Sequence, residues 1–210
     1  MSDILRSEKQ KIRSDMLKKR DRLNATSVRE AEERLRETVG EFLLREEKRT
    51  GRFPSVMSYM SFRNEFPTHS FNRWLLESKI PLILPHTDDD FRIRAFIVKD
   101  RKDLKKSRLG IEEPDPERCL QAACDDPDLI IVPGIAFDLQ GNRVGFGKGC
   151  YDRFLSQRTR PVLCIGAAYS FQVSSGGLPA EAGDFPVDQI VTEKDVLFCR
   201  RLDPWPLQSR

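Results

Sequence analysis

Residues 132–155 of this chain read VPGIAFDLQGNRVGFGKGCYDRFL. An apolar run over residues 129–132 leads into the stretch, and Pro133 with Gly134 ends that run. Turn residues follow at 140–142, and residues 151–155 can open a helix. Between the turn and the helix stand three glycines and a lysine, namely Gly145, Gly147, Lys148 and Gly149. The pattern predicts a strand, a tight glycine loop and a helix in succession.

This order suits the binding of an anion. Glycine lets backbone N–H groups approach a ligand without a Cβ in the way. A helix start adds oriented N–H groups and the positive end of its dipole, and a lysine adds a point charge. The stretch therefore predicts an anion site, most simply for a nucleotide phosphate. Its spacing is neither that of a P-loop nor the GxGxxG of a dinucleotide fold, so a glycine-rich surface hairpin is the alternative on spacing alone.

Asp152 adds a carboxylate to the mouth of this site. A carboxylate there would repel a phosphate held by Lys148 unless a hard cation such as Mg2+ lay between them. The alternative is an acidic residue in the first helical turn that favours the helix dipole.

The segment PGIAFDLQGNRVGFGKGCYDRFL closely resembles the signature of the 5-formyltetrahydrofolate cyclo-ligases, also called 5,10-methenyltetrahydrofolate synthetases. That family shows a proline-glycine pair, an FD-x-x-GNR turn, a glycine loop and a tyrosine-aspartate pair in this order. The resemblance extends from Lys9 to about Thr192. It implies ATP-dependent cyclisation of 5-formyltetrahydrofolate to 5,10-methenyltetrahydrofolate, with ATP as co-substrate, Mg2+ as cofactor and a reduced folate as substrate. A catalytically degenerate relative that only binds folate or nucleotide is the alternative.

The fold expected from the chain is an α/β domain. Strand and helix patterns alternate along the whole sequence, which predicts three layers around a largely parallel sheet. The resemblance implies the sugar-isomerase and CoA-transferase-like arrangement, with ligands at one end of the strands. A length of 210 residues fits a single domain over residues 1–210.

Residues 3–23 predict an amphipathic helix with Lys9 inside its apolar stripe and Arg13 at the edge. A lone lysine on such a face can snorkel to water along its methylene stem. The resemblance favours a role instead, because the family begins with a K-x-x-x-R pattern that contacts ATP, and KQKIR over residues 9–13 matches it. The other basic residues of this helix are expected on a solvated face, namely Arg6, Lys18, Lys19, Arg20 and Arg22.

The resemblance also implies a folate side. Glu65 matches the family glutamate that binds the pterin, and a carboxylate can accept two adjacent N–H donors from that ring. Without the resemblance, an exposed loop acid would be the simpler interpretation of this residue. Met60 is expected as an apolar wall, Phe146 as a stacking surface, and Tyr151 at the junction between folate and ATP.

The remaining roles concern the nucleotide. Lys148 and the backbone amides of Gly145, Gly147 and Gly149 are expected to hold the transferring phosphate, with Lys148 and Tyr151 as the catalytic residues. Lys9, Arg13, Arg143 and Tyr151 are expected to contact ATP. Asp152 and Asp184 are implied as Mg2+ ligands. The chain departs from the family at Phe146, Cys150 and Gly183, and none of these departures removes a residue assigned here to the chemistry.

Composition excludes several classes. A net charge of +3 gives no global electrostatic case for nucleic acid. No apolar run approaches a membrane span, and the charged N-terminus is unlike a signal peptide. Five scattered cysteines without a C-x-x-C pair favour reduced thiols in a cytoplasm. We therefore expect a cytoplasmic monomer without nucleic-acid or membrane partners.

Local signals complete the expectations. A capping box at residues 27–30 predicts the start of a second helix, and Gly51 predicts its end. Thr68 is expected to cap a third helix, and Pro85 to close a strand over residues 80–84. Residues 109–114 resemble a family linker, whereas the tail from residue 203 carries no readable motif.

Overall fold

The computed structural model of the protein describes residues 3–107 and 110–199, which leaves Leu109 of the linker and the tail from residue 203 outside the described residues. The helices are α1 (Asp3–Arg20), α2 (Ala25–Thr50), α3 (His69–Glu77), α4 (Cys150–Leu155) and the short 3-10 helices η1 (Arg101–Asp103) and η2 (Ser170–Gln172). The strands are β1 (Val56–Met57), β2 (Leu82–Thr87), β3 (Ile93–Val98), β4 (Leu104–Lys106), β5 (Glu112–Pro114), β6 (Leu120–Ala122), β7 (Leu129–Pro133), β8 (Ala136–Asp138), β9 (Arg143–Val144), β10 (Leu163–Ala167), β11 (Val173–Ser174), β12 (Gln189–Val191) and β13 (Val196–Phe198).

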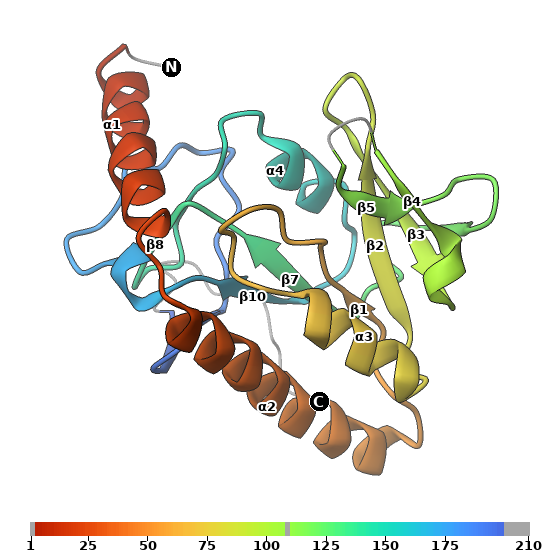
Figure 1. The fold of residues 1–210 in the computed structure, drawn as a ribbon. Helices are drawn as coiled ribbons and strands as arrows, with labels where there is room; N and C mark the ends of the chain where they lie inside the picture. Colours follow the sequence, from red (N-terminus) through yellow and green to blue (C-terminus); the bar gives the residue numbers. More distant parts are fainter. Residues whose placement is uncertain (1–2, 108–109, 200–210) are drawn as a thin grey trace.

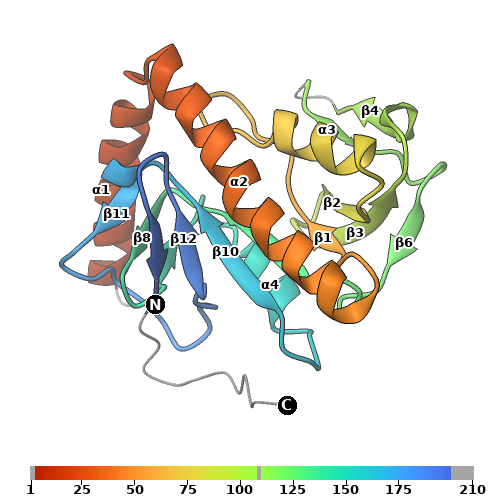
Figure 2. The same cartoon turned by 90° about the horizontal axis from the view of Figure 1, so that it is seen from below.

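An eight-stranded sheet forms the centre of the molecule, in the order β13-β12-β10-β7-β1-β2-β3-β6. Its inner strands β12, β10, β7, β1 and β2 run parallel, while β13, β3 and β6 are antiparallel to their neighbours. In Figures 1 and 2, α2 and α3 cover one face of the sheet and α4 lies against the other. The prediction of a three-layer α/β fold with a largely parallel sheet is confirmed.

Successive residues of the central strands point to opposite faces and so build two cores. Leu129 and Ile131 of β7 pack in one core with Leu35 of α2, whereas Ile130 packs in the other with Phe154 of α4. All five side chains are almost completely buried. Burial on both faces is why this strand reads as an unbroken apolar run rather than an alternating one.

The chain between β7 and α4 makes a second, three-stranded sheet in the order β11-β8-β9. Phe137 of β8 is fully buried between Gly134 and Gly166. A Cβ at Gly134 would lie 2.5 Å from the Phe137 ring, and one at Gly166 would lie 2.6 Å from it. Both glycines are therefore required by the close approach of this ring, which seats the small sheet over the carboxyl ends of β7 and β10.

Two expected boundaries were wrong. Helix α2 starts earlier than the capping box at residues 27–30 implied, because Asn24 is the N-cap and its side chain accepts the N–H of Ser27 at 2.8 Å. Strand β2 runs through Pro85 to Thr87. Beyond Ile83 this strand is paired only with β3, so the missing N–H of Pro85 costs no bond on the other side. The expected end of α2 at Gly51, in the left-handed conformation at φ 76°, is confirmed.

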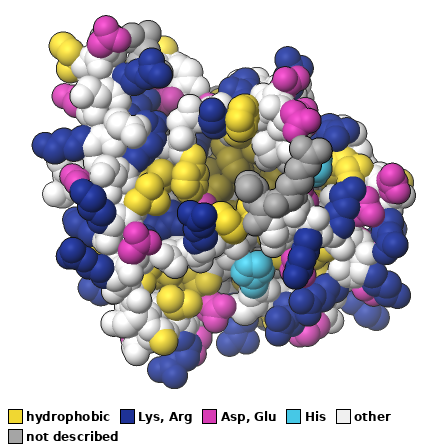
Figure 3. Space-filling view, turned by 45° about the horizontal axis from the view of Figure 1, so that its top comes forward, with side chains coloured by type: hydrophobic (Ala, Val, Ile, Leu, Met, Phe, Trp, Pro, Cys, Tyr) yellow, Lys and Arg dark blue, Asp and Glu magenta, His cyan; other side chains and the backbone are white. Residues whose placement is uncertain are grey.

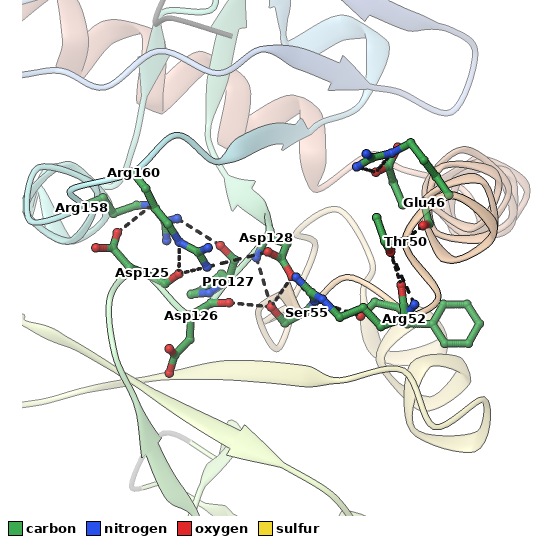
Figure 4. A network of polar contacts seen from close by, with 12 residues as sticks. Glu46, Thr50, Arg52, Ser55, Asp125, Asp126, Pro127, Asp128, Arg158 and Arg160 are labelled. Carbon is green, nitrogen blue, oxygen red and sulfur yellow. Dashed lines mark hydrogen bonds and ion pairs between the residues drawn. The ribbon is translucent and has the colours of Figure 1, made fainter. Parts of the chain in front are cut away.

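The amino ends of β1 and β7 are joined by a network of polar side chains (Figure 4). Asp128 accepts bonds from Arg52 and from both the N–H and the hydroxyl of Ser55, at 2.9–3.0 Å. Arg158, only 7% exposed, donates to the carbonyl oxygens of Cys124 and Pro127. The network ties the segments that precede β1 and β7 to the one that follows α4, and it leaves the carboxyl ends of the strands free for a site.

Candidate active site

A cleft of about 1070 Å³ lies beyond the carboxyl ends of β1, β2 and β7. Figure 3 shows the hollow, with a largely hydrophobic floor and Lys and Arg side chains around its rim. This edge of a parallel sheet is where open α/β proteins bind ligands, and the volume is at the upper end for small-molecule sites. The cleft is therefore large enough for two ligands to meet.

Helix α1 forms one wall and places two cations in the cleft. Lys9 is only 6% exposed, and its Nζ lies 2.8 Å from Oδ2 of Asp184 and 3.3 Å from Oε2 of Glu181. Burial alone would lower the pKa of Lys9, but the two carboxylates outweigh it and raise that pKa. Arg13 donates from Nε to the carbonyl oxygen of Gly145 at 2.8 Å. Lys9 is thus a buried cation with acidic partners rather than a snorkelling lysine, and Arg13 holds the glycine loop.

The glycine loop runs from β9 to α4 and lines the cleft. Gly147 has φ 94° and Gly149 has φ 62°, conformations that glycine alone adopts at little cost. A Cβ at Gly147 would lie 3.3 Å from the Arg13 guanidinium, so this glycine also gives that side chain room. Lys148 is exposed, with its Nζ 4.3 Å from the centre of the Phe91 ring. The loop therefore presents backbone and ammonium donors toward open space.

The Lys148 ammonium rests against the turn between β2 and β3. Phe91 has φ 59°, an uncommon left-handed conformation for an aromatic residue. Arg153 bridges the two segments, because it donates to the carbonyl oxygens of Lys148 and Phe91 at 2.7 and 2.6 Å. The β2–β3 turn and the glycine loop are thus held together at the open side of the cleft.

Arg143 and Tyr151 stand between the two halves of the cleft. The Arg143 guanidinium lies 5.9 Å from the Tyr151 ring centre and donates to Oδ1 of Asp152 at 2.7 Å. Arg143 Nε and the Tyr151 hydroxyl are buried without a hydrogen-bond partner among the described residues. Burial raises the pKa of Tyr151, as does the nearby charge of Glu65, so the hydroxyl keeps its proton. Each unsatisfied donor costs about 1–3 kcal/mol, a cost that a ligand with acceptor atoms would remove.

Glu65 sits on the far side of Tyr151, in a turn that follows β1. One of its oxygens accepts the N–H of Phe62 at 2.9 Å. Burial raises the pKa of Glu65, and the bond from Phe62 and the charge of Arg20 act against it. A carboxylate has about four acceptor positions, so this bond leaves capacity for a ligand. The pocket position of Glu65 disfavours the simple loop-acid interpretation.

The turn that carries Glu65 is held by hydrogen bonds between Thr68 and neighbouring backbone groups. Thr68 occupies the N-cap position of α3, but its side chain makes no capping bond, contrary to expectation. Its hydroxyl donates to the carbonyl oxygen of Tyr59 at 2.5 Å and accepts the N–H of Ser61 at 3.1 Å. Thr68 therefore stabilises the loop that carries Met60 and Glu65 and does not cap α3.

The two carboxylates expected to hold Mg2+ lie on adjoining segments. Asp152 accepts the N–H of Phe185 at 3.1 Å, and Asp184 precedes that residue. Within the described ranges, no group of three or more His, Cys, Asp or Glu side chains could hold a metal by itself. Mg2+ is commonly bound through one or two carboxylates together with substrate phosphates. The donor set therefore fits a cation that arrives with a nucleotide.

All residues predicted for the site line this one cleft: Lys9, Arg13, Met60, Glu65, Arg143, Gly145, Phe146, Gly147, Lys148, Gly149, Tyr151, Asp152 and Asp184. The structure adds residues to which the sequence assigned no role in the site: Phe91 and Glu181 line the cleft, whereas Arg20 and Arg153 bind segments beside it. The expectation that Arg20 lies on a solvated face was wrong, because this side chain is only 4% exposed.

Comparison with known proteins decides the family. Residues 5–193 match the 5-formyltetrahydrofolate cyclo-ligase family. The chain belongs to this family. A 5-formyltetrahydrofolate cyclo-ligase from Haemophilus influenzae is 26% identical over 189 residues, covering 88% of this chain and 97% of that protein. A cyclo-ligase from Mycoplasma genitalium is also 26% identical, with the same coverage.

The structural comparison agrees with membership of the cyclo-ligase family. The NMR structure of an Aquifex aeolicus 5,10-methenyltetrahydrofolate synthetase is similar with a TM-score of 0.76 and 34% identity, covering 96% of this chain and 99% of that one. The expectation of an enzyme of the ligase class is confirmed. Over residues 3–107 and 110–199, no helix is both long and apolar enough to cross a membrane.

Proposed function

We propose that this cyclo-ligase closes the ring of 5-formyltetrahydrofolate to 5,10-methenyltetrahydrofolate at the expense of ATP, in the cleft described above. The observation that carries the proposal is the pair of buried, unpartnered donors on Arg143 and Tyr151. Arg143 adjoins the glycine loop, which suits a phosphate, since a Cβ at Gly145 would lie 3.0 Å from its guanidinium, and Tyr151 is near enough to interact with the charge of Glu65, which suits a pterin. A ligand pair that meets at this point would satisfy both donors.

The reaction needs activation because a formamide is a poor electrophile and its oxygen a poor leaving group. In the proposed sequence, the formyl oxygen takes the terminal phosphoryl group of ATP, and ADP is released. N10 of the folate then attacks the formyl carbon and loses its proton, while the C–O bond breaks and inorganic phosphate leaves. The protein must supply alignment and charge neutralisation, as in other phosphoryl transfers. No protein nucleophile is required.

The residues divide between these tasks. Lys148 and the glycine-loop amides neutralise the transferring phosphate. Lys9, Arg13 and Arg143 hold the remaining phosphate charge, and the Tyr151 hydroxyl donates at the junction of the two substrates. Glu65 accepts the N–H donors of the pterin edge, with Met60 and Phe146 as apolar walls, as implied by the family resemblance.

We propose Mg2+ as the partner of the nucleotide, held by Asp152 and Asp184. Both carboxylates are paired with cations in the structure, Asp152 with Arg143 at 2.7 Å and Asp184 with Lys9 at 2.8 Å. Asp152 and Asp184 would hold the metal, and Arg143 and Lys9 would then be available to the phosphates. The metal when bound supplies charge neutralisation for the phosphates. ATP alone would meet the two carboxylates, and Mg2+ alone would meet the two cations. We therefore expect each ligand to strengthen the binding of the other.

The function is tested by measuring ATP cleavage with and without 5-formyltetrahydrofolate. The expected result is phosphate release that depends on the folate and equals the amount of methenyl product, followed by its absorbance. Binding of both ligands without phosphate release would instead identify a degenerate binding relative. We further propose a single-domain, cytoplasmic monomer without a nucleic-acid partner, and size-exclusion chromatography of the pure protein tests its oligomeric state.

A further inference from the structure

Arg20, at the last position of α1, is a buried cation outside the expected site. Its side chain is 4% exposed, and Nε donates to the carbonyl oxygen of Asn64 at 2.7 Å. Burial lowers the pKa of Arg20, although an arginine remains charged throughout the physiological range. Burying a charge costs free energy unless nearby groups compensate for it. The compensating groups around Arg20 therefore indicate what the residue does.

The bond from Arg20 holds the middle of the turn that carries Glu65. Residue Arg63 of this turn has φ 53°, a conformation that costs free energy for a residue with a side chain. The turn is closed by the N–H of Glu65 bonding to the carbonyl oxygen of Phe62 at 3.2 Å. Asn64 is held again by its side chain, which donates to Asp21 at 2.9 Å. The end of α1 thus clamps a strained turn at two points.

The charge of Arg20 also acts on the Glu65 carboxylate. The positive charge of Arg20 lowers the pKa of Glu65, against the burial that raises it. The other titratable groups facing Glu65 are the hydroxyls of Tyr59, after β1, and Tyr151, on α4. Both are kept protonated by burial, which raises their pKa values. Among these groups, Arg20 therefore supplies the positive charge near the Glu65 carboxylate.

We propose that Arg20 is a positioning residue of the folate half of the cleft, which fixes the Glu65 turn through its bond to Asn64 and provides a positive charge near the carboxylate. The inference rests on the proposed role of Glu65 in binding the pterin. It also assigns a double task to α1, since Lys9, Arg13 and Arg20 follow one another at four- and seven-residue spacings on one helix face. The first two serve the nucleotide side, and Arg20 serves the folate side.

Two substitutions separate the geometric task from the electrostatic one. Arg20→Lys keeps the charge but loses the planar guanidinium, and Arg20→Gln keeps a donor but loses the charge. Arg22→Gln, on an exposed residue two positions on, is the matched control for removing a positive charge from this segment. KM for 5-formyltetrahydrofolate, KM for ATP, the pH profile of kcat/KM for the folate and the melting temperature are measured for each variant and for Glu65→Gln.

Arg20→Gln should raise the folate KM by about 10-fold or more, as expected for loss of a charged bonding partner, and leave the ATP KM close to wild type. The acid limb of its folate pH profile should shift to higher pH, because Glu65 then gains its proton more easily. Arg20→Lys should leave the acid limb in place and raise only the folate KM, by a smaller factor. Arg22→Gln should match wild type in all four measurements.

Unchanged folate KM in both Arg20 variants would overturn the proposal, as would an equal rise of both KM values with a lowered melting temperature. If Arg20→Gln does not fold, Arg20→Lys tests the proposal by the same criterion, a raised folate KM with an unchanged ATP KM. An unaltered folate KM in Glu65→Gln would overturn the role of Glu65 and the proposal with it. Absence of methenyl product from the wild-type enzyme would instead refute the proposed function.

Discussion

Replacing Lys148 with alanine should lower turnover by at least ~100-fold while leaving the free energy of unfolding almost unchanged. The structure separates the two effects. Lys148 is exposed, and its ammonium lies 4.3 Å from the centre of the Phe91 ring. An exposed cation–π contact contributes about 0.5–1 kcal/mol, which sets the limit of the stability loss. A 100-fold fall in turnover corresponds to about 2.7 kcal/mol of transition-state stabilisation. That energy requires the ammonium to leave the ring for the transferring phosphate.

The assay follows methenyl product and phosphate release at saturating ATP and 5-formyltetrahydrofolate, so that a change in KM does not hide the effect. Urea denaturation of the same preparations gives the free energy of unfolding. Lys102→Ala, on an exposed lysine of η1 outside the cleft, is the matched control and should leave both quantities near wild type. Near-normal turnover in Lys148→Ala would refute the assignment. So would a loss of unfolding free energy as large as the loss of transition-state stabilisation, because the effect would then be structural.

Three further outcomes are expected. Asp152→Asn should weaken activity strongly and move half-activation to higher Mg2+ concentration, and a Mg2+ titration that matches wild type in both respects would exclude Asp152 as a ligand. Cys150→Ala should retain activity, so abolition of turnover with folding intact would contradict a mechanism without a protein nucleophile. Burial would raise the pKa of Asp128, but its bonds from Arg52 and Ser55 outweigh this and lower it below its ordinary value of 3.8. The stabilisation by these bonds is therefore present above pH 3.8 and is lost as the pH falls through the lowered pKa of Asp128. Asp128→Asn should cost about 2 kcal/mol at neutral pH, and urea denaturation at several acidic pH values should show the difference from wild type shrinking.

The site was more predictable from the sequence than the boundaries of the elements around it. The glycine loop could be located because left-handed backbone restricts residue choice, and Gly147 and Gly149 do adopt left-handed conformations. The start of α2 was misplaced because Asn24 and Ser27 are both good N-caps, and local sequence does not decide between them. Strand β2 was cut short at Pro85 because the tolerance of a proline depends on which edge of the strand is paired, and this is a property of the whole sheet.

Charge pairing was the other property that the sequence left open. Lys9 was assigned to ATP and Asp184 to Mg2+, and the two are 175 positions apart, yet in the structure they bind each other at 2.8 Å. The sequence identifies groups that a bound nucleotide would need. It does not show which residues these groups pair with when no nucleotide is bound. The paired arrangement has a physical reason, because separate cations and carboxylates in one cleft would each pay a cost of burial. The pairs lower that cost and remain exchangeable, since Asp184 keeps a side chain 22% exposed.

Helix α1 shows how one element can unite what the sequence presents as separate signals. Its fully buried residues are Lys9 and Arg20, both charged, while the apolar residues Leu5, Ile12 and Met16 are only half-buried, so polar contacts contribute strongly to its packing. Those partners lie in three different segments, the 181–184 loop, the glycine loop through Arg13, and the Glu65 turn. Each of these segments is held by a different side chain of α1, so the loss of one contact leaves the other two in place. This is why removal of the Arg20 contact is expected to raise the folate KM while the ATP KM stays near wild type.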